Sequence, residues 1–242
     1  MENKKSKLVR KSTYLKSPLR KGNLITPLPG FNPDNYQKLG QKILSNGQKL
    51  QTGYDVSSFL KSVYELNEPE TREIQEIMSK FKVFVYQTNF WLPEKEIMPG
   101  MYSVHDSKAQ GMDMEFNRDK LEAMLDVHDT FHGVRYNPET GVAFAPRSTI
   151  KLGLERDWKK FATEGSKIAI FLPEGAQNLA DLGKENFNRG YTFGVSGNDQ
   201  LQKSTSVIYG EEYFHRELQV ENNIQDKDLG GFSWGKTAEQ LK

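Results

Sequence analysis

Three of the four histidines lie within one stretch of the chain, residues 105–132, together with several carboxylates. Imidazole nitrogens and carboxylate oxygens are common ligands of Zn²⁺ and Mn²⁺, and an ion held this way can activate water for hydrolysis. On a helix, two histidines four residues apart point the same way, and His128 and His132 have this spacing. The stretch therefore predicts the metal site of a hydrolase, with five candidate ligands: His105, Asp113, Glu115, His128 and His132.

The same residues also have a purely structural interpretation. Asp129 follows His128 at the position where a zinc protease would carry Glu, and Gly133 is a natural end for the helix. In this interpretation His128 packs on the core face of the helix, and His132 interacts with the carbonyls at its C-terminal end. No metal or other cofactor is then required.

Residues 230–237, Gly-Gly-Phe-Ser-Trp-Gly-Lys-Thr, satisfy the letter pattern of a phosphate-binding loop. Such a loop needs a buried strand before it and a helix after it, because the helix N-terminus faces the phosphates. The preceding residues, QDKDL, do not form a buried strand pattern, and AEQLK is too short for the helix. We therefore interpret the match at Gly230–Thr237 as chance and predict no nucleotide site there.

Charge is distributed very unevenly along the chain. Lys and Arg total 33 and Asp and Glu total 32, yet the first 21 residues hold eight basic side chains and a single acid, Glu2. The rest of the chain therefore has a net charge of −6. The basic residues are Lys4, Lys5, Lys7, Arg10, Lys11, Lys16, Arg20 and Lys21.

Such a basic segment can dock on an acidic neighbour, either another copy of the chain or another subunit. It can also contact nucleic-acid phosphates without sequence specificity. Tyr14 is its only aromatic residue up to position 30, so it offers charge without a series of stacking platforms.

Composition excludes several classes of protein. The chain has no cysteine, which rules out disulfides, Cys-ligated metals and a Cys nucleophile. No apolar run approaches the roughly 20 residues of a membrane helix, so we expect no membrane contact. The basic N-terminus lacks the apolar core of a secretory signal, and we expect an intracellular or virion location.

The order of the expected elements indicates an α+β fold. Apolar spacing predicts helices over 36–44, from Asp55 and from Pro69, and a strand over 82–88. The later part contains a helix capped by Asn117, a hairpin over 134–144 and an apolar strand over 167–172. Helices first and strands later favour a mainly antiparallel or mixed sheet.

We predict three regions: a basic extended arm and linker over 1–30, a single core domain over 31–220 and a polar C-terminal tail over 221–242. The absence of a convincing catalytic set favours a non-enzymatic structural or assembly protein, one copy of a larger particle. A virion tail, neck or capsid accessory component is an example. The metal-dependent hydrolase is the alternative function, and nucleic-acid association through the arm is the third.

Overall fold

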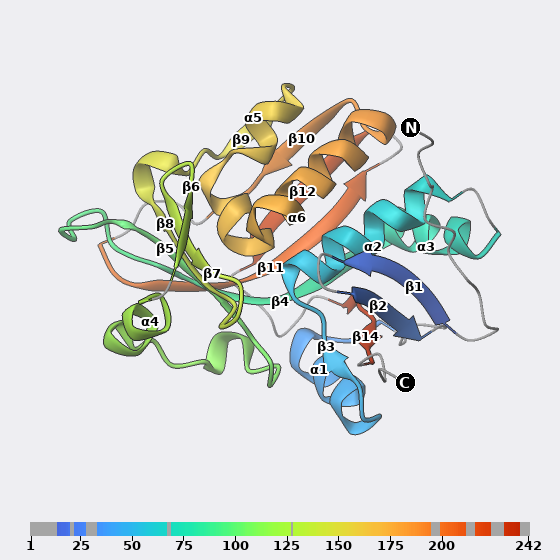
Figure 1. The fold of residues 1–242 in the computed structure, drawn as a ribbon, viewed down its shortest axis with the longest axis horizontal. Helices are drawn as coiled ribbons and strands as arrows, with labels where there is room; N and C mark the ends of the chain where they lie inside the picture. Colours follow the sequence, from blue (N-terminus) through green and yellow to red (C-terminus); the bar gives the residue numbers. More distant parts are fainter. Residues whose placement is uncertain are drawn as a thin grey trace.

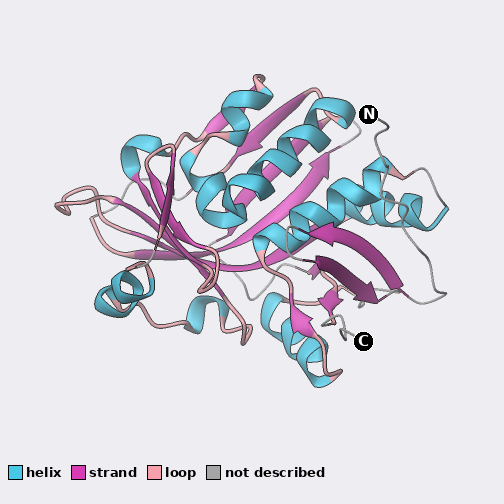
Figure 2. Cartoon of the chain, in the orientation of Figure 1, coloured by secondary structure: helices cyan, strands magenta, loops and turns pink. Residues whose placement is uncertain are grey.

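The computed structural model describes residues 14–19, 22–27, 33–66, 69–126, 128–194, 199–211, 216–223 and 230–237. The fold is α+β, as the sequence predicts, with helices packed on a large twisted sheet (Figure 2). The helices are α1 (Tyr36–Ser45), α2 (Gly53–Glu65), α3 (Pro69–Lys80), α4 (Arg118–Met124), α5 (Trp158–Ala162) and α6 (Gly165–Asn186), with 3-10 turns η1 (Gly111–Asp113) and η2 (Arg147–Thr149). None of the helices described here is both long and apolar enough to cross a membrane.

The main sheet of the described chain has the strand order β6-β7-β8-β5-β4-β11-β12-β10-β9, with β13 also paired to β4 (Figure 1). Its strands are β4 (Lys82–Trp91), β5 (Gly100–His105), β6 (Asp129–Phe131), β7 (Val134–Asn137), β8 (Val142–Pro146), β9 (Gly153–Glu155), β10 (Arg189–Thr192), β11 (Gln202–Glu211), β12 (Glu217–Asn223) and β13 (Gly231–Phe232). The β10–β12 and β13–β4 pairs are parallel and the others are antiparallel, so the sheet is mixed.

Strand β4 lies at the centre and is buried on both faces. Because successive side chains of a strand point to opposite faces, Val83 and Val85 join the core formed with α2, α3, α5 and α6. Phe84 and Tyr86 point the other way and pack with α1. This two-sided burial explains why residues 83–86 are apolar throughout instead of alternating with polar residues.

The predicted local signals near helix ends and turns are largely confirmed. Asn117 caps α4 by accepting a hydrogen bond from the Lys120 N–H at 2.9 Å. Strands β7 and β8 form the hairpin expected over 134–144. The second helix begins at the cap Thr52 instead of Asp55, and Asp55 completes a capping box from inside its first turn.

The prediction of a strand over 167–172 is wrong, because this run is the first half of α6. A short apolar run fits either a buried strand or a helix buried on all sides, and residues 165–171 of α6, which are all buried, are of the second kind. Helix α6 packs against α2, with the Lys61 ammonium 2.6 Å from the Asp181 carboxylate, and also contacts the sheet. The carboxylate of Glu164 caps its N-terminus by accepting from the N–H groups of Ser166 and Lys167.

Residues 14–27, within the range expected to be an extended arm and linker, form an antiparallel hairpin of β1 (Tyr14–Leu19) and β2 (Gly22–Pro27). The hairpin is joined to the body at its open end, where the Gln51 amide donates to the buried Thr26 hydroxyl at 3.0 Å. Thr26 pairs with Leu15, so the first residues of β1 lie beside the residues that lead into α2.

Residues 230–237, within the range expected to be a polar tail, pack into the folded body. Strand β13 pairs with β4, and β14 (Gly235–Lys236) pairs with β3 (Lys49–Leu50). Trp234 between them is 1% exposed and its ring lies 5.0 Å from that of Phe59. Phe232 and Trp234 explain why this otherwise polar segment packs into the body, because burying their rings stabilises the fold.

Candidate functional site

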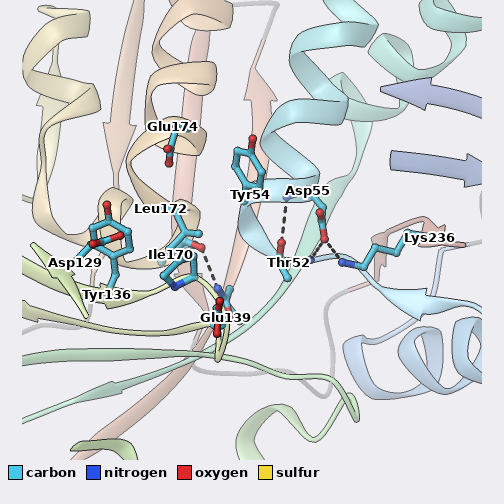
Figure 3. Close-up of a pocket in the computed structure, with 13 residues that line it drawn as sticks. Thr52, Tyr54, Asp55, Asp129, Tyr136, Glu139, Ile170, Leu172, Glu174 and Lys236 are labelled. Atoms are coloured by element: carbon cyan, nitrogen blue, oxygen red, sulfur yellow. Dashed lines mark hydrogen bonds and ion pairs between the residues drawn. The ribbon is translucent and has the colours of Figure 1, made fainter. Parts of the chain in front are cut away.

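A pocket of about 520 Å³ opens where the N-terminus of α2, the middle of α6 and the β6–β8 strands meet (Figure 3). This volume is in the range typical of ligand sites. Its walls combine apolar, acidic and aromatic side chains, and we call it the α2–α6 pocket. It is lined by Thr52, Tyr54, Asp55, Gln87, Asp129, Tyr136, Pro138, Glu139, Gly141, Ile170, Leu172, Glu174 and Lys236.

The α2 wall is held by the capping box. The Thr52 hydroxyl accepts from the Asp55 N–H at 3.2 Å, and the Asp55 carboxylate accepts from the Thr52 N–H at 2.8 Å. Asp55 is only 4% exposed and also forms an ion pair with Lys236. The ion pair between Asp55 and Lys236 holds β14 against the α2 wall, so residues far apart in sequence form one wall of the pocket (Figure 3).

The α6 wall contains a break in the helix at Leu172. Its backbone has φ 62° and ψ 166°, a region that is almost reserved for glycine and costs a larger residue about 1–3 kcal/mol. Pro173 follows, and proline disfavours helical geometry in the residue before it. The break places Leu172 on the pocket wall and the exposed Glu174 just beyond it.

A buried amide forms part of the pocket lining. Gln87 on β4 is 3% exposed, and its Nε2 donates to the Ile170 carbonyl at 3.0 Å. Its Oε1 has no hydrogen-bond partner among the residues that the structure describes. An unsatisfied buried acceptor of this kind costs about 1–3 kcal/mol.

His105 is the neighbour of Gln87 across the β4–β5 pair. Its Nδ1 lies 3.0 Å from the Tyr86 carbonyl, and burial lowers the pKa of the imidazole below its usual 6.5. The Tyr86 hydrogen bond opposes this lowering of the pKa without cancelling it.

The charged residues of the lining are mainly acidic. They comprise four carboxylates, Asp55, Asp129, Glu139 and Glu174, and one ammonium group, Lys236. Asp55 forms an ion pair with Lys236, and Asp129, Glu139 and Glu174 are exposed at the pocket rim. The arrangement suits a ligand with cationic groups that face the rim carboxylates and an apolar part that contacts Leu172 and Pro138.

The structure does not support the predicted metal geometry. Helix α4 ends at Met124, so His128 and His132 are not on one helix. His128 is exposed with Nδ1 2.6 Å from the Leu125 carbonyl, and His132 lies in the β6–β7 turn with φ 47°. The sequence Val-His-Asp-Thr-Phe, rich in strand-forming residues, leads into β6 and ends the helix early.

The remaining candidate ligands are also separated. His105 and Glu115 line a smaller cavity of about 230 Å³, while the Asp113 carboxylate accepts from the Gln37 amide at 2.7 Å. Within the described residues, no group of three or more His, Asp and Glu side chains is placed to hold a metal ion.

Most of the predicted basic contact residues lie outside the described chain. Lys16 lies within β1. The residues outside the described chain are Lys4, Lys5, Lys7, Arg10, Lys11, Arg20 and Lys21. The segment 230–237 forms strands β13 and β14, and Lys236 pairs with Asp55. This is not the strand–loop–helix arrangement of a phosphate-binding loop.

Sequence reasoning did not identify Gln87, Leu172 or the tyrosines of the pocket. The dipeptide Leu172-Pro173 at the end of an apolar run was an available signal for a break in the chain. No sequence signal connects Gln87 to that break, because the contact joins residues 83 positions apart.

No family model matches the chain, and no curated protein matches it. One solved structure is similar, described as "Accommodation of massive sequence variation in Nanoarchaeota by the C-type lectin fold". The TM-score is 0.55, over 88% of this chain and 98% of that chain, at 11% sequence identity. At this identity the likeness concerns the fold alone.

Proposed function

We propose that this protein is a non-enzymatic assembly protein, one copy of a larger multi-subunit particle, whose basic N-terminal segment docks on a neighbouring subunit. The observation that carries the proposal is the separation of charge. Eight basic residues and one acid occupy positions 1–21, and the rest of the chain has a net charge of −6. Opposite charges on two parts of one chain attract copies of it to one another.

The likeness to the C-type lectin fold supports a binding role. The solved relative is described as a fold that accommodates massive sequence variation. A scaffold of that kind is suited to carrying different binding surfaces, since its core does not depend on one fixed set of surface residues. A particle such as a virion tail, neck or capsid accessory ring is the setting that we propose for this chain.

The test is the molar mass of the nuclease-treated full-length protein, measured by light scattering at low and high salt. We expect a discrete higher-order species that dissociates as salt rises. The triple variant Lys7→Glu, Arg10→Glu, Lys11→Glu should be shifted toward the monomer at low salt. The matched control reverses three exposed lysines of the body: Lys95→Glu, Lys159→Glu and Lys184→Glu.

A monomeric wild type, or an arm variant that assembles like the wild type, would overturn the proposal. Loss of the large species on nuclease treatment alone would also overturn it, because the particle would then be held together by nucleic acid. Equal dissociation of the control variant would show that total charge, and not the basic segment, governs assembly.

A further inference from the structure

We infer that the α2–α6 pocket is the receptor for residues 7–11 of a second copy of this chain, and that copies associate by exchanging these segments. The inference rests on the proposed function and names its site. It depends on two features of the described structure: the lining of the pocket and the place where β1 begins.

The pocket and the segment have complementary patterns. Residues 7–11 are Lys-Leu-Val-Arg-Lys, an apolar pair flanked by three cations. The pocket offers apolar surface from Leu172 and Pro138, together with carboxylates at its rim. Leu8 and Val9 can therefore be buried while the flanking cations face the exposed carboxylates Asp129, Glu139 and Glu174.

Strand β1 begins near the α2 wall of the pocket. Thr26 is hydrogen-bonded to Gln51, the residue before the pocket residue Thr52, and pairs with Leu15. The chain that precedes Tyr14 therefore joins the body close to the α2 wall. Residues 7–11 lie three to seven positions before Tyr14, so they reach at most about 25 Å from it when extended, and the pocket that they enter must lie within this distance.

Each copy has one segment and one pocket, so insertion can run head to tail, from each copy into the next, and such contacts close into a ring. Every copy of the ring then gives one segment and receives one. These linked contacts act together, so association can be much tighter than one segment alone would give.

The first experiment locates the segment in the full chain. A photo-crosslinking amino acid replaces Leu8, and isotopically heavy and light chains are mixed before irradiation. We expect crosslinks from position 8 to residues 129–139 or 170–174 that join heavy to light chains. Crosslinks to other regions, or crosslinks confined to chains of one isotopic label, would overturn the inference.

The second experiment exchanges charges between the two sites. Reversing the segment (Arg10→Glu, Lys11→Glu) or the pocket rim (Asp129→Lys, Glu139→Lys) should reduce the associated fraction at least tenfold at equal concentration. Mixing the two variants should restore association, because each segment then meets a pocket of opposite charge. The pair Glu94→Lys, Glu185→Lys is the control, since both residues are exposed and lie outside the pocket.

The outcomes separate the inference from the proposed function. If reversing the segment dissociates the particle and reversing the rim does not, the segment docks elsewhere, so the inference fails and the proposed function stands. If neither reversal changes the molar mass, both fail. Failure of the mixed variants to associate, with both still folded by circular dichroism, would also overturn the inference.

Discussion

The ammonium of Lys167 lies 2.9 Å from the carboxylate of Glu164, and both side chains are almost completely buried, at 2% and 3% exposed. Burial lowers the pKa of Lys167, and the neighbouring carboxylate opposes that effect. The ammonium also contacts the Thr192 hydroxyl and lies over the ring of Phe161, 4.3 Å from its centroid. The pair connects the start of α6 to α5 and β10, so it links three elements of the core.

Removing one partner of this pair should be strongly destabilising. We expect Lys167→Ala to lower the free energy of unfolding by about 3–5 kcal/mol, because a buried carboxylate is left without its cation. Lys167→Met with Glu164→Gln should lose clearly less, since no uncompensated charge remains. Urea denaturation of the two variants checks the difference, and equal losses would show that packing and not charge dominates the site.

His105 should make stability depend on pH in mildly acidic solution. Because its folded-state pKa lies below 6.5, the unfolded chain takes up this proton first as pH falls. Its contribution is therefore complete above about pH 6.5 and decreases from there toward the folded-state pKa. Thermal melts of the wild type and His105→Gln between pH 7.5 and 5 should show a shallower decline in the variant.

The exposed His128→Gln variant is the control for this experiment, because it keeps His105. It should reproduce the pH dependence of the wild type. Identical profiles for the wild type and His105→Gln would show that other groups account for the acid sensitivity.

The parts of the structure that could be predicted from sequence are those set by neighbouring residues. Asn117 as a cap and the Pro-led turn between β7 and β8 depend on a few adjacent positions. The run 167–172 could not be assigned correctly, because its helical state depends on burial by α2 and the sheet. The pocket was missed for the same reason, since its lining comes from segments as far apart as Thr52 and Lys236.

The break in α6 should reverse the usual preference for alanine over glycine. At Leu172, glycine removes the backbone strain whereas alanine keeps it. Both substitutions remove the packing of the Leu side chain, and the two variants differ in packing by a single methyl group. We expect Leu172→Gly to be more stable than Leu172→Ala by about 1–3 kcal/mol. At the exposed Gln177, in regular helix, alanine should be the more stable by about 1 kcal/mol.

Chemical denaturation of the four variants measures both differences. An alanine preference at position 172 equal to that at 177 would mean that the backbone relaxes to helical geometry when Leu172 is removed. If the break shapes the pocket, the Kd for a peptide of residues 1–13 should also differ between Leu172→Gly and the wild type. Fluorescence anisotropy measures that Kd.

Trp234 should behave as a core residue despite its place near the C-terminus. It is 1% exposed and packs on Phe59 and Phe232, with ring centroids 5.0 and 5.1 Å away. We expect Trp234→Ala to cost about 3–5 kcal/mol of the free energy of unfolding. Trp234→Phe should cost much less, because it keeps an aromatic ring and removes an indole N–H that has no partner within the described chain.

Limited proteolysis gives a second measurement of the role of Trp234. Cleavage within 230–237 should accelerate in Trp234→Ala together with global unfolding. Rapid cleavage there in the folded wild type would show that the segment is not part of the core.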